Sequence, residues 1–462
     1  CCYPNCSRCL ASPECSLIHS GCYAVFRAAS GTKNTKALHR RLWLFTAWKR
    51  PWTVARPLCL PIRSMHAAVL KQATESLGLP NLFKLPAELL DQIHDNSRGY
   101  FFWRCVSALR LALDESGDLD DALEVLRLNS IVSWERHGLL KLARYGTLPP
   151  IIRITMDEDG ISKVKRLPAI PSYDGEHHKH YAYIVVHEEC MTVLYVDAPF
   201  NLQPSQNGRL RLQLPRENPT FAIWNTPCPP CMLDGDALGY TRDSFFSASL
   251  PWNLSGDHLY AIDMASITGI TFFYSHDELL GVHPHCSSGD TASSTFERLS
   301  YRLKSQTVWI YLPISKSDPI TSLGIIVSER PASILRNPKI EIQICTGTQL
   351  TGVTVIGSQH TAPGPVECSW KSAPITLVYA KPQERRGVWL SSYGSNQSAL
   401  LELPITPVIP KLGGETAYYS EAPLDNVSSA VLFLDEKNIY CRGILFRYLD
   451  GSCRALGECR VH

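Results

Sequence analysis

The stretch LPPIIRIT, residues 148–155, separates two parts of the chain that differ in hydrophobic periodicity. Before it, apolar residues recur every three or four positions, the spacing typical of amphipathic helices. After it, β-branched and aromatic residues gather in short runs between turn-forming residues, as in YAYIVV, residues 181–186, and ITFFY, residues 270–274. The sequence therefore predicts an α+β protein, with a helical N-terminal part and a large antiparallel β-rich region.

The β-rich region is expected to span residues 149–462. Its further candidate strands lie at residues 192–196, 209–214, 307–312, 324–328, 339–344, 352–357, 375–379, 430–434 and 443–448. Many short strands with little helical pattern indicate a β-sandwich, a propeller or a jacalin-like prism. We expect this region to divide into two subdomains near residues 290–320.

A weak internal repeat lies within the β-rich region. GITFFY at residues 269–274 matches GILFRY at residues 443–448, and each is followed by a Leu-Gly pair, Leu280-Gly281 and Leu456-Gly457. Apolar alternation after a glycine predicts a half-buried strand that follows a tight bend. The later glycine of each copy is expected to lie in the return turn.

Residues 85–148 are expected to form a run of short helices. Apolar residues recur at helical spacing in three groups, which are Leu85, Leu89 and Ile93, then Phe102, Val106, Leu109 and Leu113, then Leu119, Leu123 and Leu126. Asp118 or Asp120 is suited to cap the third helix, because a short side-chain oxygen satisfies the free amides of a first turn.

Overall composition excludes few function classes. The chain has 462 residues, of which 45% are hydrophobic and 19% are charged, with a formal net charge of +2. These values describe an ordinary globular protein without a global attraction to nucleic acid or membranes. No apolar run approaches the roughly 18 residues of a membrane span. We therefore expect an intracellular, soluble protein of the cytoplasm or nucleus.

Residues 31–84 form a basic linker or helical segment. Residues 1–84 contain twelve Lys and Arg but only two acidic residues, Glu14 and Glu75, a formal excess of +10. Three tryptophans accompany this charge between residues 40 and 63, a combination that can stack on and pair with nucleic acid. The favoured interpretation is a helix that packs its tryptophans and exposes its cations, so nucleic acid is not an expected partner.

Residues 1–30 contain a candidate zinc module. Cys6 and Cys9 are three residues apart, as are His19 and Cys22, and two such pairs complete one tetrahedral site. Such a site is closed and structural, so the expected cofactor is structural zinc. Cys2 and Cys15 are alternative ligands, and surface or disulfide-bonded cysteines are an alternative interpretation.

The other cysteine and histidine groups favour structural roles. Cys228-Pro-Pro-Cys231 has dithiol spacing but lies in a proline-rich loop. His177, His178, His180 and His187, beside Glu188 and Glu189, are typical of a solvated turn more than of a metal site, and His283 and His285 are interpreted as loop residues beside the first repeat. Signatures of known catalytic loops are absent from the sequence, and we therefore do not expect an enzyme.

LPAELLDQI, residues 85–93, resembles the opening helix of the F-box, LPxELLxxI. The chain is also similar to fungal F-box-like proteins that have a cysteine-rich start with an H-x2-C-[WY] element, here residues 19–23, and a PPIIR strand, here residues 149–153. The resemblance implies that one helix face docks a Skp-type adaptor of cullin ubiquitin ligases. The implied adaptor-binding residues are Leu85, Pro86, Leu89, Leu90 and Ile93.

Two functions follow from these observations. The first is an F-box-like substrate receptor, whose β-rich region binds an unknown target protein for a cullin-type ubiquitin ligase. The alternative is a lectin-like β-rich recognition protein that has no link to ubiquitin ligases, in which the repeat strands present a carbohydrate-binding surface.

Overall fold

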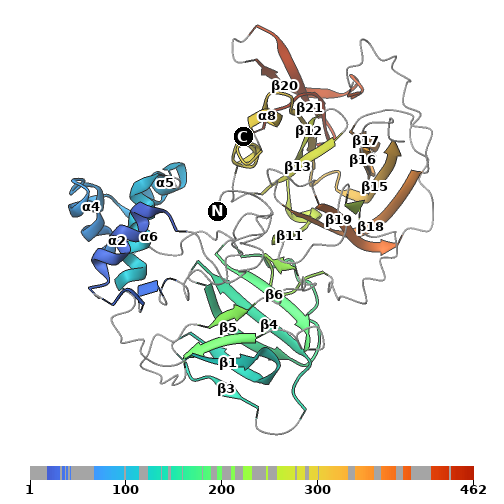
Figure 1. Ribbon diagram of the computed structural model, residues 1–462. Helices are drawn as coiled ribbons and strands as arrows, with labels where there is room; N and C mark the ends of the chain where they lie inside the picture. Colours follow the sequence, from blue (N-terminus) through green and yellow to red (C-terminus); the bar gives the residue numbers. More distant parts are fainter. Residues whose placement is uncertain are drawn as a thin grey trace. The chain divides into compact units, whose positions relative to one another are not determined.

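The computed structural model describes most of the chain. The described residues are 18–31, 34–36, 38–39, 42, 67–97, 100–113, 123–136, 138–143, 147–158, 160–178, 180–188, 195–199, 210–213, 222–230, 246–247, 258–275, 278–286, 291–299, 301–330, 339–357, 366–380, 389–396, 418–435 and 439–461. They form an α+β protein in which strands outnumber helices (Figure 1).

The chain folds into two compact units. Unit 1 comprises Cys1–Pro171 with His178–Ile223, and unit 2 comprises Ser172–His177 with Trp224–His462. The β-rich region thus divides after Ile223 and not near residues 290–320. The expected position is unsuitable because β14, Val308–Pro313, pairs with β12, Gly269–Ser275, so a division there would split one sheet.

The described helices of unit 1 include α2 (Ser20–Ala29), α4 (Ala67–Ser76), η1 (Leu82–Lys84), α5 (Ala87–Ser97), α6 (Phe101–Leu113) and η2 (Leu128–Ser130). Helices α4, α5 and α6 share one core, to which they contribute Leu70, Leu90 and Val106 respectively. Phe26 of α2 packs with Ala108 of α6 in a second cluster. Residues 20–29 therefore belong to the helical assembly and are not a separate terminal module. None of the described helices is long and apolar enough to cross a membrane.

The predicted third helix over residues 119–126 is wrong where the structure describes it. Leu123–Arg127 form strand β1, which pairs antiparallel with β7, Tyr195–Pro199. Helical spacing over so short a window does not separate a helix from a buried strand. Pairing with a distant strand therefore decided the structure of this segment.

The remaining strands of unit 1 surround one core. They are β2 (Ile131–Glu135), β3 (Lys141–Leu142), β4 (Ile151–Asp157), β5 (Gly160–Leu167), β6 (Ala182–His187) and β8 (Arg211–Gln213). One antiparallel sheet has the order β6-β4-β5-β2-β3, and a smaller sheet has the order β1-β7-β8. Leu126 of β1 and Ile152 of β4 lie in the same buried cluster, so the two sheets enclose a common core.

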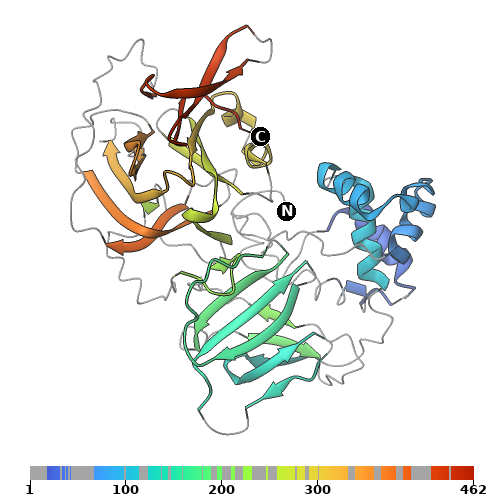
Figure 2. The same cartoon turned by 180° about the vertical axis from the view of Figure 1, so that it is seen from behind.

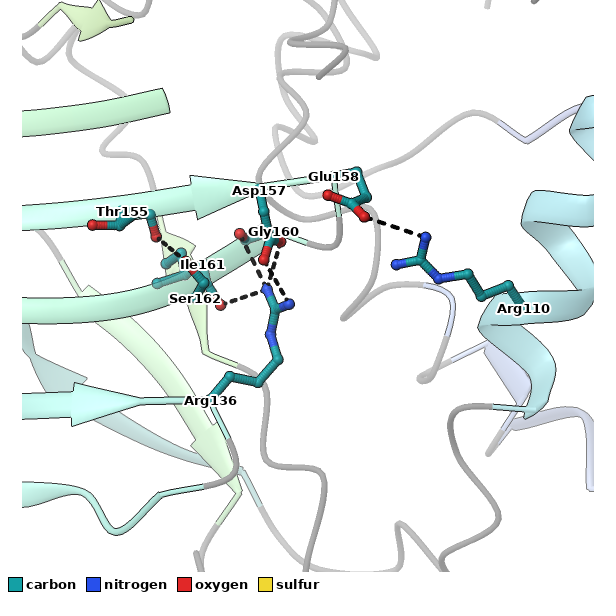
Figure 3. Close-up of polar contacts among 8 residues, drawn as sticks. All are labelled: Arg110, Arg136, Thr155, Asp157, Glu158, Gly160, Ile161 and Ser162. Atoms are coloured by element: carbon teal, nitrogen blue, oxygen red, sulfur yellow. Dashed lines mark hydrogen bonds and ion pairs between the residues drawn. The ribbon is translucent and has the colours of Figure 1, made fainter. Parts of the chain in front are cut away.

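Two arginines fix the tip of the β4–β5 hairpin in unit 1 (Figure 3). Arg136, which follows β2, donates two hydrogen bonds to the Asp157 carboxylate, at 2.9 and 2.8 Å, and a third to the Ile161 carbonyl at 3.0 Å. Arg110 of α6 forms an ion pair with Glu158 at 3.4 Å, and both side chains are largely buried. The tip is thus held by charge-assisted hydrogen bonds, which are stronger than neutral ones.

The described strands of unit 2 form three antiparallel groups, and Figure 2 draws them from behind. Its elements are β10 (Phe246–Ser247), β11 (His258–Asp263), η4 (Met264–Ser266), β12, β13 (Glu278–His285), α7 (Ala292–Phe296), α8 (Tyr301–Lys304), β14, β15 (Ile320–Arg330), β16 (Lys339–Thr348), β17 (Gly352–Ile356), β18 (Val366–Ala380), β19 (Trp389–Asn396), β20 (Val427–Leu434), β21 (Cys441–Tyr448) and β22 (Cys453–Gly457), while β9 is the short strand Ile223–Trp224. The largest sheet runs β17-β16-β15-β18-β11 with β19 beside β18, and the others are β13-β12-β14 and β20-β21-β22.

Strand β12 is covered on both faces. Phe272 and Tyr274 point into the core shared with the largest sheet, whereas Phe273 packs with Trp309 and the helices α7 and α8 on the other face. Successive side chains of a strand point to opposite faces, so a strand that is buried on both faces needs an apolar residue at every position.

The two repeat copies occupy equivalent positions. The first forms β12 and the second forms β21, and each is the central strand of a three-stranded antiparallel sheet. The expected place of the later glycines is wrong, because Gly281 lies inside β13 and Gly457 ends β22. Each pairs with the central strand, Gly281 with Phe273 and Gly457 with Gly443.

Gly443 is expected to be intolerant of a side chain. A Cβ atom at this position would lie 2.6 Å from the carbonyl carbon and oxygen of Glu458, which are backbone atoms that cannot turn away. Gly443→Ala should therefore destabilise unit 2 by about 1–3 kcal/mol, the usual cost of overpacking, as measured by urea denaturation. Ser429→Ala, at an exposed site of neighbouring β20, is the control and should change stability by less than about 0.5 kcal/mol. Equal stability of the two variants would contradict the clash.

Candidate functional site

Helix α5 forms as the sequence predicts, with Pro86 directly before its first residue. The Pro86 carbonyl accepts hydrogen bonds from the amides of Leu89 and Leu90, both at 3.1 Å. Proline suits this position because the first amides of a helix have no partner within the helix. Helix α5 therefore begins directly after Pro86, at the start of the F-box-like motif.

The five residues implied by the resemblance do not form one exposed face. Leu89 is 44% exposed and Ile93 is 38% exposed, and Pro86 is also exposed. Leu90 is only 6% exposed and lies in the helical core, against which the half-buried Leu85 packs. Leu90 therefore anchors α5 inside the protein and is not accessible to a partner, which leaves Pro86, Leu89 and Ile93 as the available apolar ridge.

The C-terminal end of α5 is fixed on α6. The Trp103 indole nitrogen donates a hydrogen bond to the Ser97 hydroxyl at 2.7 Å, and the ring of His94 meets the Trp103 ring edge-on, with centroids 4.9 Å apart. Trp103 itself is buried. Together with Leu90, these contacts hold both ends of the helix while its outer ridge stays exposed.

The surroundings of α5 differ from the expected helical region over residues 85–148. One described helix, α6, follows α5, and the next described element is strand β1. Helices α2 and α4, which precede the motif in sequence, supply the packing partners instead. The inner face of α5 must be buried, and it packs in a core to which the preceding helix α4 contributes.

The predicted zinc ligands are partly described. Cys6 and Cys9 lie outside the described residues. His19 caps α2, and its Nδ1 atom accepts a hydrogen bond from the Gly21 amide at 3.2 Å. Cys22 is half-buried on α2 and packs against the cluster around Phe26. Among the described residues, no group of three or more metal-binding side chains comes together. The zinc site stays a prediction.

Most other cysteine and histidine groups have structural surroundings. Cys228 lies in a loop, with its sulfur 3.8 Å from an Asp174 carboxylate oxygen, and Cys231 lies outside the described residues. His178 packs edge-on against the Tyr181 ring at a centroid distance of 6.0 Å. Glu188 forms an ion pair with Arg166 at 2.6 Å, so this carboxylate is already engaged.

His283 and His285 lie on strand β13 and not in a loop. The imidazole of His283 is buried, with its Nδ1 atom 2.8 Å from the Thr295 hydroxyl. His285 places its Nε2 atom 2.8 Å from the Thr271 hydroxyl, and burial lowers its pKa to about 4. His285 is thus a neutral hydrogen-bonded residue at physiological pH.

Unit 2 contains a pocket that sequence reasoning missed. It has a volume of about 100 Å³ and is lined by β14, the facing ends of β16 and β17, strand β22 and residues 419–421. Its walls combine apolar side chains with eight hydroxyl-bearing residues and three charged residues, Asp318, Glu421 and Arg454. No sequence motif could reveal it, since its walls come from segments spread over residues 310–455.

Asp318 and Arg454 both form hydrogen bonds to the β16–β17 hairpin at this pocket. The buried Asp318 carboxylate accepts hydrogen bonds from the Leu350 amide at 2.7 Å and from the Thr351 amide and hydroxyl at 3.1 and 2.8 Å. The Arg454 guanidinium donates to the Thr354 hydroxyl and to the Thr351 carbonyl. The turn is therefore held on both sides before any ligand enters.

Arg454 and Tyr311 are two residues of the pocket lining whose pKa values are shifted. Burial lowers the pKa of Arg454, while Tyr448, Asp318 and Glu421 oppose this effect. Burial raises the pKa of Tyr311 to about 12, so its hydroxyl stays protonated and donates to the Thr268 carbonyl at 3.2 Å. Neither residue is therefore prepared to exchange protons near neutral pH.

Comparison with known proteins gives no independent assignment. No protein-family model matches the chain, and no curated protein is significantly similar to it.

Proposed function

We propose that this chain is an F-box-like substrate receptor that docks a Skp-type adaptor of a cullin-type ubiquitin ligase through α5. The observation that carries the proposal is that α5 is anchored by one apolar residue and exposes two others. Leu90 is buried at 6% exposure, while Leu89 and Ile93 are exposed at 44% and 38%. The helices around α5 serve as an F-box-like module. The chain would then hold two proteins together without doing chemistry itself.

Helix-in-groove recognition supports this assignment. Leu89 and Ile93 are four residues apart, so they lie one above the other on the same helix face, and Pro86 precedes Leu89 by three. Amphipathic helices commonly dock by placing such residues in an apolar groove of the partner. Anchoring of α5 at Leu90 and Trp103 favours binding, because the helix need not be ordered at the moment of contact.

The β-rich part would recognise the target protein. In unit 1 the strands of two sheets share one core, and in unit 2 the β12 sheet shares a core with the strands of the largest sheet. Both are rigid scaffolds from which loops can present a binding surface.

The docking helix can be tested without disturbing the core. Leu89→Asp combined with Ile93→Asp should weaken binding of a recombinant Skp-type adaptor by more than about 100-fold, because two apolar contacts of roughly 1.5–3 kcal/mol each are lost. Binding of the full chain to the immobilised adaptor would be measured by biolayer interferometry. Leu90 is left intact, since a charge at that site would unfold the helical core.

A matched control separates docking from general hydrophobicity. Leu139 and Leu142 are exposed at 57% and 43% and belong to the β-sheet part of unit 1. Leu139→Asp with Leu142→Asp should leave adaptor binding unchanged, and circular dichroism should report folded protein for both double variants. A wild-type chain that does not bind the adaptor, or an equal loss in both variants, would remove the proposal.

A further inference from the structure

We propose that the pocket between β14, β17 and β22 of unit 2 binds an uncharged, hydroxyl-rich ring, the chemistry of a monosaccharide. This inference goes beyond adaptor docking and does not depend on it, because every residue involved lies in unit 2, whereas α5 lies in unit 1.

The size of the pocket limits the ligand. Its volume is about 100 Å³, whereas a single water needs roughly 10–15 Å³ and a cavity of about 150 Å³ takes a benzene molecule. Because the pocket is smaller than the cavity that takes benzene, it admits one edge of a six-membered ring, and the rest of the ring stays at the mouth. A nucleotide or an acyl chain would be too large.

The charges of the pocket oppose an ionic ligand. Arg454 is the cation of the lining; its two terminal nitrogens donate to Thr354 and to Thr351, and its Nε is a buried donor without a partner among the described residues. Two carboxylates, Asp318 and Glu421, are near enough to stabilise its charge. A phosphate or carboxylate would meet those carboxylates, and a cation would meet the guanidinium, so the pocket favours a neutral ligand.

Two threonine hydroxyls at the pocket have capacity left for a ligand. Thr346 of β16 and Thr354 of β17 are directly paired across the two strands, so their side chains lie side by side on one face. Thr346 is only 1% exposed and belongs to the lining of the pocket. Thr354 accepts a hydrogen bond from Arg454, which leaves its own proton to donate.

A sugar matches this pattern of donors and acceptors. A hydrogen bond between a ligand hydroxyl and the Thr346 hydroxyl would contribute about 0.5–1.5 kcal/mol to binding. Each hydroxyl of a sugar both donates and accepts, as the threonine and tyrosine hydroxyls of the wall do. Ile310 and Ile356 are apolar residues of the lining that pack in the core on the same face as Thr346 and Thr354, and they would meet the C–H groups of the ring.

The wall is also organised in advance. Asp318 holds the turn at Leu350 and Thr351 through three hydrogen bonds, and Arg454 ties the same hairpin to β22. Little conformational entropy of the pocket wall is therefore lost when a ligand binds. A few contacts can then be sufficient for binding.

Binding can be tested with the full chain and a panel of free monosaccharides. The panel would contain glucose, galactose, mannose, fucose, N-acetylglucosamine and xylose, observed by saturation-transfer NMR and quantified by calorimetry. At least one sugar should bind, and Thr346→Val should weaken it by about tenfold or more, because one hydrogen bond is lost at constant side-chain shape. Arg454→Met should also weaken binding, since the orientation of Thr354 is lost.

Controls and a second format make the outcome decisive. Thr376→Val makes the same chemical change on β18, outside the lining, and should leave affinity unchanged. If Arg454→Met fails to fold, Thr346→Val alone decides, because it removes one hydroxyl of the lining and keeps the shape of the side chain. A glycan array run in parallel distinguishes a free monosaccharide from the terminal sugar of a glycan as the ligand. Binding on the array without binding of free sugars would indicate the terminal sugar.

Two results would overturn the inference. The first is the absence of binding in both formats. The second is sugar binding that neither Thr346→Val nor Arg454→Met weakens, which would place the sugar elsewhere. The Leu89→Asp, Ile93→Asp chain should bind sugar normally, so failure of adaptor docking and failure of this inference are distinguishable.

Discussion

Arg166→Met is expected to destabilise unit 1 by about 3–5 kcal/mol, the usual cost of breaking a buried ionic network. The Arg166 side chain is only 2% exposed and forms an ion pair with Glu188 at 2.6 Å. It also donates to the carbonyls of Ile131 and Pro149, both at 3.0 Å, and to that of Asn129. Methionine fills much of the same volume but leaves these acceptors without a donor.

Hydrogen exchange read by mass spectrometry would measure this effect unit by unit. Amides of β2, β4 and β5 should lose protection in Arg166→Met, while peptides of unit 2 serve as the internal reference. Lys163→Met is the matched control, because Lys163 and its partner Glu135 have side chains that are 44% and 68% exposed. The control should cost less than about 1 kcal/mol. A similarly small cost for Arg166→Met would show that the network contributes little to stability.

Unit 2 is expected to lose stability in acid through His285. Its pKa is lowered to about 4 by burial, whereas an unfolded histidine has its ordinary value of 6.5. The unfolded state therefore binds the proton more tightly, and stability falls as the pH drops from about 6.5 towards 4, then levels off. The full shift corresponds to about 3.4 kcal/mol, and allowing for the partly exposed ring we expect a loss of about 2 kcal/mol.

Comparison with a variant isolates the contribution of His285. The groups facing it are the Thr271 hydroxyl at 2.8 Å, the His283 ring at a centroid distance of 4.9 Å and the Tyr311 ring at 5.2 Å. Urea midpoints of unit 2 at pH 7 and pH 4.5 would be measured for wild type and His285→Gln. Between pH 7 and pH 4.5, His285→Gln should lose about 1–2 kcal/mol less free energy of unfolding than wild type. The exposed His177→Gln control should follow wild type, and a His285→Gln profile that also follows it would contradict this assignment.

The strands were predictable because their pattern is local. The runs at residues 270–274 and 443–448 lie in β12 and β21, and residues 308–312 of the run at 307–312 lie in β14. β-branched and aromatic residues suit a pleated, buried surface whatever strand lies beside them. Leu123–Arg127 shows the limit, because its leucines fit either periodicity and pairing with Tyr195–Pro199 decided the outcome.

The candidate docking helix was only half predictable. Pro86 and the leucine spacing indicate a helix with an apolar edge, and α5 begins directly after Pro86. Which leucine points inward depends on where α4 and α6 lie, and this placed Leu90 in the core and left Leu89 exposed.

The sequence by itself determined the secondary-structure class, the start of α5 and the equivalence of β12 and β21, since each depends on neighbours a few residues apart. Tertiary structure alone decided the division after Ile223, the burial of Leu90 and the pocket around Arg454. The physical reason is separation along the chain: Arg454 meets Thr351 and Thr354 across about a hundred residues, and no local pattern records that contact.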